Sequence, residues 1–325
     1  MIDARFEYGT GVNLRRLYGV WKFTEGWGLL VGQEYTPITF FLSGQVFDVD
    51  AGLLQVGMAY GARFGQITLQ GKLGPGDLKI GAVTQNTPNL LFQATDPATG
   101  TLVTLQTAVE SYIPKLEASY QMMFADNMSG HVFGGFQTVK YYIDNFDGTD
   151  SSETINSFTF GLGVDLNFGP MFVKSQGSYY RNGSVAAWLG AGGGSLAAYS
   201  GLPSSVTSGF ASELPSVVNA SVNDVNTYMA MLALGFSPTE QLTLEAGIGW
   251  LYTNYDAPSG ASELDKNTRL KYYLQAVYQM APGVFLIPEI GYRDFGDIEY
   301  TGFAADPKED LGSLFYFGAK WQINF

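Results

Sequence analysis

The sequence of 325 residues has no cysteine, a single histidine and few charged residues. Without cysteine, the chain has neither a disulfide scaffold nor a thiolate metal site. The one histidine leaves no room for a histidine-rich metal centre or for an evident serine–histidine pair. Charged residues make up 14% of the chain, below the ~25% typical of soluble domains. The formal net charge of −13 disfavours a nucleic-acid partner. We therefore expect no enzymatic activity, no metal, no cofactor and no nucleic-acid partner.

The sequence also lacks any run of 18 apolar residues, which excludes a transmembrane helix. Nevertheless 46% of the residues are hydrophobic and 15% are aromatic, which is incompatible with a disordered chain. The mean hydropathy is close to zero. A transmembrane β-barrel gives this value, because lipid-facing and lumen-facing residues alternate along each strand. The chain begins without a hydrophobic leader, so we expect a mature form or a chain that is incomplete at its N-terminus.

Strict alternation of apolar and polar residues is the main signal that the sequence does contain. In Ser157–Phe168 every even-numbered residue is apolar, and every odd-numbered residue is Ser, Thr, Gly, Asp or Asn. The same pattern recurs in 116–124, 242–252 and 270–280. These segments match the ~9–11 residues that a tilted strand needs to cross a bilayer. A soluble β-sandwich is the alternative, but it would have shorter strands and few aromatic residues at strand ends.

The pattern predicts an all-β fold, a transmembrane antiparallel up-and-down β-barrel that forms a single domain over residues 1–325. Short turns at 25–28, 73–76, 125–130, 169–170, 237–240 and 281–283 alternate with longer polar segments, as in outer-membrane barrels. Aromatic residues beside the short turns would form an interfacial girdle: Phe23, Trp27, Phe124, Phe168, Phe172, Phe236 and Phe285. Fourteen strands are expected: 2–9, 13–24, 28–37, 63–73, 77–86, 113–124, 130–143, 153–168, 171–182, 224–236, 241–254, 267–280, 284–297 and 310–325.

The last strand ends in a terminal Phe325 that shares one face with Ile323 and Trp321. This arrangement resembles the C-terminal signal of bacterial outer-membrane barrels, which the barrel-assembly machinery reads. The segments Asn13–Gly19 and Leu29–Glu34 are similar to paired strands of Gram-negative diffusion porins, particularly the DcaP-like group. In that group an Arg-bearing strand is followed by a strand that leads to the constriction loop, and Ala62–Ile67 resembles the strand after the loop.

The resemblance implies a sixteen-stranded barrel, a homotrimer and a location in the outer membrane of a Gram-negative bacterium. Two strands precede the Arg-bearing hairpin in that group. The resemblance therefore implies that this chain lacks the first hairpin or is a genuine fourteen-stranded variant.

Alternation assigns most charged residues of the strands to the lumen, since a lysine or arginine facing lipid at mid-depth costs ~2–4 kcal/mol. The predicted pore-lining bases are Arg5, Arg16, Lys22, Lys72, Lys79, Lys115, Lys174, Arg269, Lys271, Arg293 and Lys320. The inward acids are Asp3, Glu7, Glu34, Glu117, Asp165, Glu245 and Glu289. The bases outnumber these acids, and most of the remaining acid lies in the long connections. Two explanations of these charges remain open: they are simply solvated by water in the lumen, or they have a selective function.

The segment 38–62 is a candidate constriction loop, because it is too apolar for an exposed tip. If it folds into the barrel, Asp48 and Asp50, together with Glu34, would oppose Arg5 and Arg16 across the pore. The alternative is an outer loop packed at a subunit contact. The segment 183–223 is the longest connection, for which we expect a solvated extracellular loop rather than an inward plug.

Two further features favour simple interpretations. The acidic segment 144–150 has closely spaced oxygen ligands but lacks the terminal glutamate of an EF-hand, so a solvated turn is favoured over a calcium site. His131 lies beside a short turn without a neighbouring nucleophile and is expected at the interface.

The sequence thus predicts a porin that contacts outer-membrane lipid and passes small hydrophilic solutes and ions, with a mild preference for anions. A structural or adhesive barrel with a plugged lumen is the alternative.

Overall fold

The computed structural model describes residues 2–7, 11–47, 53–54, 56–87, 92–95, 102–105, 107–144, 150–189, 216–218, 221–255, 263–301 and 308–324. All regular elements within these ranges are β-strands. No helix in the described part of the chain is long and apolar enough to cross a membrane.

Fourteen long strands dominate the fold. They are β1 (Ile2–Glu7), β2 (Gly11–Lys22), β3 (Trp27–Tyr35), β4 (Arg63–Leu73), β5 (Gly76–Val83), β9 (Lys115–Ala125), β10 (Met128–Asp144), β11 (Asp150–Phe168), β12 (Met171–Arg181), β15 (Val225–Thr239), β16 (Leu242–Tyr255), β17 (Glu263–Ala281), β18 (Val284–Asp294) and β21 (Ser313–Ile323). Each corresponds to one strand expected from the alternation, so the strand pattern is confirmed. The ends of several strands differ from the expected ones by a few residues.

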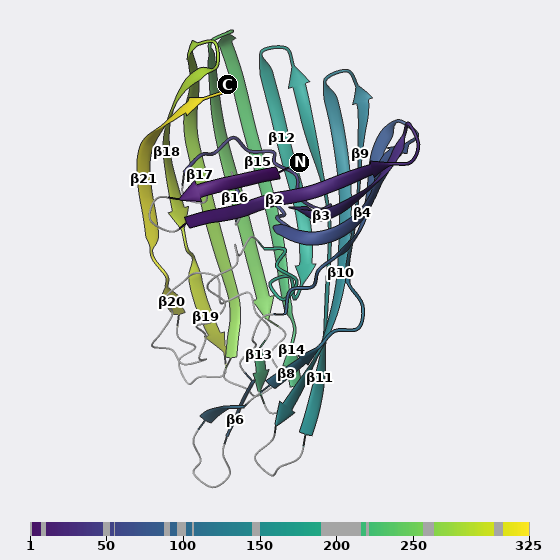
Figure 1. Ribbon diagram of the computed structural model, residues 1–325. Coiled ribbons are helices and arrows are strands. Elements are labelled where there is room, and N and C mark those ends of the chain that lie inside the picture. Colours follow the sequence, from purple (N-terminus) through teal and green to yellow (C-terminus); the bar gives the residue numbers. More distant parts are fainter. Residues whose placement is uncertain are drawn as a thin grey trace.

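The long strands form one antiparallel meander in which each strand pairs with its neighbours in this series (Figure 1). The six predicted short turns lie at one end of the sheet, and the strand ends from which the long connections start lie at the other (Figure 1). Three short strands extend the same sheet at the long-connection end: β8 (Thr107–Glu110), β19 (Asp297–Thr301) and β20 (Lys308–Asp310). A separate four-stranded sheet consists of β6 (Phe92–Thr95), β7 (Leu102–Leu105), β13 (Ser216–Val218) and β14 (Ser221–Asn223).

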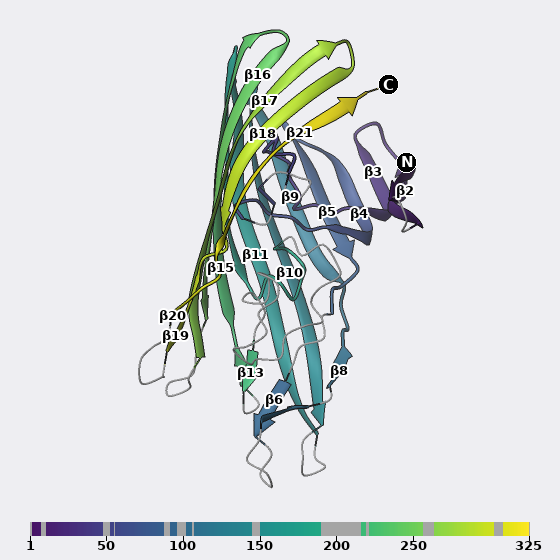
Figure 2. The same cartoon turned by 90° about the vertical axis from the view of Figure 1, so that its left-hand side faces the viewer.

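The sheet curves strongly but is open in this structure. Among the described residues, β1 pairs with β2 alone and β21 pairs with β18 alone, and no pairing joins β1 to β21. The structure therefore differs from the expected closed barrel. The physical reason is the direction of the first strands: β1 and β2 run across the open side of the sheet instead of alongside β21 (Figure 1). Figure 2 shows the same curved sheet from the side.

Alternation along the strands separates an apolar convex face from a polar concave face. On β11 and β17, Phe160, Leu162 and Leu274 lie on the convex face and are more than half exposed. On the concave face, Thr159, Gln176 and Arg269 are buried. A globular protein in water would have the reverse arrangement, because apolar surface is buried away from water. The fold therefore suits a sheet that has lipid outside and polar contents inside.

Aromatic rows border the convex apolar face at both ends. Strand register places Phe160 beside Tyr179, Tyr179 beside Tyr228, and Tyr228 beside Tyr252. On β11 this row lies eight residues from Phe168 at the short turn. At ~3.3 Å per residue, the two rows are ~26 Å apart along the strand. Strands of outer-membrane barrels tilt by ~35–45°, so this distance corresponds to a height of ~20 Å, somewhat less than their ~25 Å apolar band.

The expected girdle beside the short turns is present in part. Phe23, Phe124, Phe168 and Phe236 are exposed on the convex face. Phe172 shares a face with Lys174 and Gln176 on β12, and Phe285 shares a face with the buried Ile287 on β18. These two rings therefore point to the concave side, because the strand period is two residues.

Candidate channel lining

The inner loop is the connection 36–62 between β3 and β4, and its described residues, 36–47, 53–54 and 56–62, lie within the concavity of the sheet. Its backbone amides have few strand partners and bond instead to carboxylates on the concave face. Gly44 N donates to Glu245 Oε1 of β16 at 2.7 Å, and Val46 N donates to Glu289 Oε2 of β18 at 2.7 Å. Hydrogen bonds to ionised carboxylates are stronger than neutral ones. These bonds attach the inner loop to β16 and β18, which lie far from β3 and β4, the strands that the loop connects.

Glycines of the wall allow the inner loop to approach the strands closely. A side chain at Gly249 of β16 would overlap the carbonyl oxygen of Val56, and one at Gly318 of β21 would press on the ring of Phe47. The wall therefore has its smallest residues where the loop makes contact. The inner positions of β16 alternate with large outer residues, so these glycines do not interrupt the convex face.

The Trp188 segment, residues 182–189 after β12, also enters the concavity. It turns inward at Asn182, which has a left-handed backbone with φ of 52°. The Asn182 side chain donates to Asp224 Oδ1 at 2.6 Å and accepts a hydrogen bond from Val225 N at 2.9 Å. These bonds tie the start of the long connection to its end. All residues from 182 to 189 are buried, so this described part differs from the solvated loop expected for 183–223; residues 190–215 lie outside the described residues.

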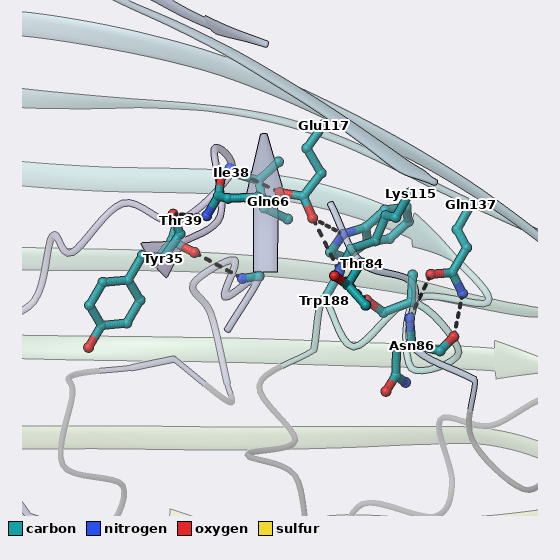
Figure 3. A network of polar contacts seen from close by, with 12 residues as sticks. Tyr35, Ile38, Thr39, Gln66, Thr84, Asn86, Lys115, Glu117, Gln137 and Trp188 are labelled. Carbon is teal, nitrogen blue, oxygen red and sulfur yellow. Dashed lines mark hydrogen bonds and ion pairs between the residues drawn. The ribbon is translucent and has the colours of Figure 1, made fainter. Parts of the chain in front are cut away.

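Lys115 and Glu117 of β9 join both inward segments to the wall (Figure 3). Glu117 Oε1 accepts a 2.8 Å hydrogen bond from Trp188 Nε1 and lies 3.4 Å from Lys115 Nζ. Lys115 Nζ also donates to the carbonyl of Ala186 at 2.9 Å. Glu117 Oε2 faces the amide of Ile38 at 3.5 Å. The ion pair is completely buried, so each charge is compensated by a partner inside the protein.

The two inward segments pack on each other and on the wall through apolar side chains. Tyr60 N donates a hydrogen bond to the carbonyl of Trp188, and Tyr60 forms an isolated parallel β-bridge with Leu189. One cluster contains Ile38, Val56, Ala59, Phe133, Tyr180, Ala186, Trp188, Leu189, Met229 and Leu251. A second contains Leu42, Leu53, Leu54, Met58, Met231, Ala233 and Tyr273. Much of the concavity beside β10 to β17 is therefore filled.

A polar pocket of about 340 Å³ lies between the inner loop and strands β2 to β5. Its charged lining residues are Arg16, Glu34 and Lys79, and its amide-bearing ones are Gln66 and Gln70. Arg16 forms a bidentate ion pair with Glu34, in which Arg16 Nε donates to Glu34 Oε1 at 2.7 Å. In the described part of the chain, Lys79 makes no ion pair. The pocket therefore offers a solute both positively and negatively charged side chains, together with amides that donate and accept hydrogen bonds.

The Arg16–Glu34 pair corrects one sequence expectation. Glu34 was expected to oppose Arg16 across the pore, but the two side chains meet on adjacent strands. The register Leu17 with Gln33 places Arg16 directly opposite Glu34 in the β2–β3 hairpin. Two opposite charges on one face of neighbouring strands then pair with each other. The other expected acids of the constriction, Asp48 and Asp50, lie outside the described residues.

The remaining predicted lining bases occupy three kinds of position. Lys115, Arg269, Lys271 and Arg293 are buried on the concave face. Lys72 and Lys174 pair across strands with Asp77 and Asp165 near the short turns. Lys22, Lys79 and Lys320 share the concave face and are exposed. The side chain of Arg5 lies outside the described residues, and so does Phe325, whereas Trp321 and Ile323 are exposed on the convex face.

Sequence reasoning missed three residues of the interior. His131 was expected at the interface, but it is buried on the concave face and stacks on Phe40 of the inner loop at 3.9 Å. Trp188 falls in the segment 183–223, which was assigned to solvent, and Asn182 falls at the end of the expected strand 171–182. The dipeptide Asn182-Gly183 is a turn signal that marks the inward bend. Within the described residues, no group of acidic or histidine side chains is arranged to hold a metal ion.

Solved structures with the same architecture are outer-membrane proteins. The outer membrane channel DcaP of Acinetobacter baumannii matches with a TM-score of 0.63 at 15% identity, covering 100% of this chain and 79% of that chain. The trimer form of OmpT from Vibrio cholerae matches with a TM-score of 0.57 at 13% identity, covering 99% and 84%.

The fold resembles that of outer-membrane barrels, with a sheet that is open between β1 and β21 among the described residues. The likeness to DcaP-like porins inferred from the sequence is thereby confirmed at the level of fold. No family model and no curated protein matches the sequence.

Proposed function

We propose that the protein is a channel in the outer membrane of a Gram-negative bacterium, through which small hydrophilic solutes and ions diffuse passively. The polar pocket between the inner loop and β2 to β5 carries this proposal, because it is a water-accessible space with charged and amide side chains among the described residues of the concavity. The apolar convex face with its two aromatic rows supports the membrane location. DcaP, which shares the fold, is an outer membrane channel.

In this proposal the inner loop, with the candidate range 38–62, is the constriction of the channel. Arg16 is neutralised by Glu34, so the exposed Lys79 gives the pocket its net positive charge and a mild preference for anions. The protein works as a homotrimer, as OmpT does in its trimer form. The C-terminal strand with Trp321, Ile323 and Phe325 is read by the barrel-assembly machinery.

Reconstitution into planar bilayers tests the proposal. We expect discrete conductance steps. In a salt gradient, we expect the sign of the reversal potential to indicate a preference for anions. Lys79→Glu reverses the charge of the pocket and is expected to shift this potential toward cations. Lys140→Glu is the matched control, since Lys140 lies over the ring of Tyr142 on the convex face. A wild-type protein without conductance contradicts the channel, and cation selectivity contradicts the basic pocket.

A structural barrel with a plugged lumen is the second candidate function. The filling of the concavity by the inner loop and the Trp188 segment favours it. Liposome swelling with sugars of graded size separates the two functions. A channel gives swelling rates that fall with sugar size, whereas a plugged barrel gives no swelling with any of them.

A further inference from the structure

The wall strands β16, β17, β18 and β21 carry the same arrangement of glutamate, glycine and tyrosine twice. We call each copy a Glu–Tyr unit: the first consists of Glu245, Gly247 and Tyr273, and the second of Glu289, Gly291 and Tyr316. In each unit the tyrosine is paired in register with the glycine of the neighbouring strand, and the glutamate lies two residues before that glycine. Because paired residues and residues two apart share one face of a sheet, all members lie on the concave side.

Each glycine leaves room for the tyrosine ring of its unit to cross over it. A Cβ on either glycine would lie 2.3 Å from an atom of that ring. The hydroxyl of Tyr273 donates to Glu245 Oε1. The hydroxyl of Tyr316 donates to Glu289 Oε1 at 3.0 Å. Two neighbouring pairs of strands therefore present a carboxylate and a phenol side by side in the same arrangement.

The inner loop lies across both units with residues 43–47, which we call the docked segment. At the first unit, Ser43 Oγ and the hydroxyl of Tyr273 form a hydrogen bond of 2.6 Å. The backbone N of the next residue, Gly44, donates to Glu245 Oε1 at 2.7 Å. One side chain and one backbone amide of the loop thus occupy the phenol and the carboxylate of the first unit.

The second unit holds the next three residues in the same manner. Gln45 Nε2 donates to the hydroxyl of Tyr316. Val46 N donates to Glu289 Oε2 at 2.7 Å, and Phe47 N donates to Glu289 Oε1 at 3.3 Å. Both carboxylate oxygens of Glu289 therefore accept hydrogen bonds from the loop backbone. Only an ionised carboxylate accepts at both oxygens without carrying a donor of its own.

Hydrogen bonds, rather than ion pairs, hold the two glutamates in place. Both are buried, and none of the ion pairs between described residues includes either of them. Lys271 acts on Glu289 electrostatically without direct pairing. The charged and titratable side chains of the strands around the docked segment are Arg269, Lys271, Tyr273, Arg293, Tyr316 and Lys320. These bases and tyrosines ordinarily keep their charge state between about pH 7 and pH 4. Asp48, the next residue of the loop, lies outside the described residues.

We propose that Glu245 and Glu289 are positioning residues of the constriction, which dock residues 43–47 on the wall only while both are ionised. Protonation places a donor on an oxygen that accepts from a loop amide, and the lost charge weakens the remaining bonds. The docked segment then leaves the wall and enters the path of the solutes, so the inner loop is a gate that acid closes. The gating rests on the proposed channel function, whereas the docking does not.

Hydrogen exchange of residues 43–47 tests the docking without reference to conductance. In Glu289→Gln the side-chain amide has one acceptor atom, so it cannot accept from both Val46 N and Phe47 N. We expect these amides to exchange about tenfold faster than in wild type at about pH 7, because a charge-assisted hydrogen bond contributes a factor of this order. Asp165→Asn is the matched control, since Asp165 is a wall carboxylate that pairs with Lys174. We expect wild-type exchange of residues 43–47 in this control.

Single-channel recording tests the gate. We expect wild type to show one long-lived open level at about pH 7 and frequent brief closures at about pH 4, where a glutamate ordinarily becomes protonated. The double variant Glu245→Gln/Glu289→Gln is expected to show these closures already at about pH 7 and to change little on acidification. Asp165→Asn is expected to follow the wild-type pH profile. A folded-state shift on unboiled electrophoresis gels verifies that each variant is folded.

Three results would overturn the inference. Wild-type exchange of residues 43–47 in Glu289→Gln shows that this carboxylate does not dock the loop. Faster exchange with an unchanged current shows that the docked segment is not a gate. Closures that increase on acidification equally in wild type and in the double variant show that another group, such as His131 or Asp48, titrates instead. A wild-type protein without conductance contradicts the proposed channel, and the exchange result still decides the docking.

Discussion

Glu117 is the residue on which the two inward segments depend most directly. Its carboxylate accepts from Trp188 Nε1 and neutralises Lys115, and neither member of the ion pair is exposed. A buried ion pair contributes little relative to an apolar replacement, but removal of one partner leaves an uncompensated charge. The consequence of losing this single carboxylate is therefore large compared with that of losing a surface carboxylate.

Glu117→Gln is expected to lower the free energy of unfolding by about 3–5 kcal/mol, since the ammonium group of Lys115 stays buried without its counter-charge. The measurement is a denaturant titration of the folded protein in detergent. Asp77→Asn is the matched control, because Asp77 pairs with Lys72 in an exposed position, where a loss of about 0–1 kcal/mol is expected. Equal effects of the two substitutions would contradict the role assigned to Glu117.

The ion pairs of the wall show what residue-level reasoning from sequence can reach. Arg16 with Glu34, Lys72 with Asp77 and Lys174 with Asp165 are direct cross-strand pairs of hairpins. Counting outward from each short turn would have predicted them, because the turn sets the register. The contact of Glu117 with Trp188 was beyond such counting. It joins residues 71 positions apart through a segment that leaves the sheet.

Among the elements, the inner loop depends on glycines of the wall as well as on hydrogen bonds, because these glycines leave room for its backbone. Gly249 faces the carbonyl of Val56, and any Cβ at this position overlaps it. Filling a packed site forces a shift that costs about 1–3 kcal/mol. Part of the inner loop is therefore positioned by one glycine on the opposite wall.

Gly249→Val is expected to displace Leu53 and Val56 from β16 and to change the single-channel conductance. Gly177→Val is the control, since a Cβ at Gly177 of β12 meets open space. Both substitutions add the same β-branched side chain to a strand, so a difference between them reports on the inner loop. An unchanged conductance for Gly249→Val, with the protein folded, would show that this loop does not bound the conducting path.

At the scale of the whole molecule, alternation identified the fourteen strands and their two faces, because both are local properties of the chain. It did not reveal the opening between β1 and β21, which depends on how the twist of successive strands accumulates. Alternation also did not predict that the concavity is filled. Apolar residues such as Phe133 and Met229 break the polar pattern of the inner face, but only at the places where an inward segment packs on them. The open edges are the feature with the greatest physical cost in a membrane.

Each edge strand presents a row of backbone groups without strand partners, and in lipid an unsatisfied group of this kind costs several kcal/mol. We therefore expect β1 and β21 to pair when the protein is in a bilayer. Amide hydrogen exchange in nanodiscs measures this. In a closed barrel the amides of Ser313–Ile323 are protected as uniformly as those of Leu242–Tyr255 on β16, which has partners on both sides. In an open sheet only every second amide of β21 bonds to β18, so alternate amides exchange fast. Alternating protection along β21 would contradict closure.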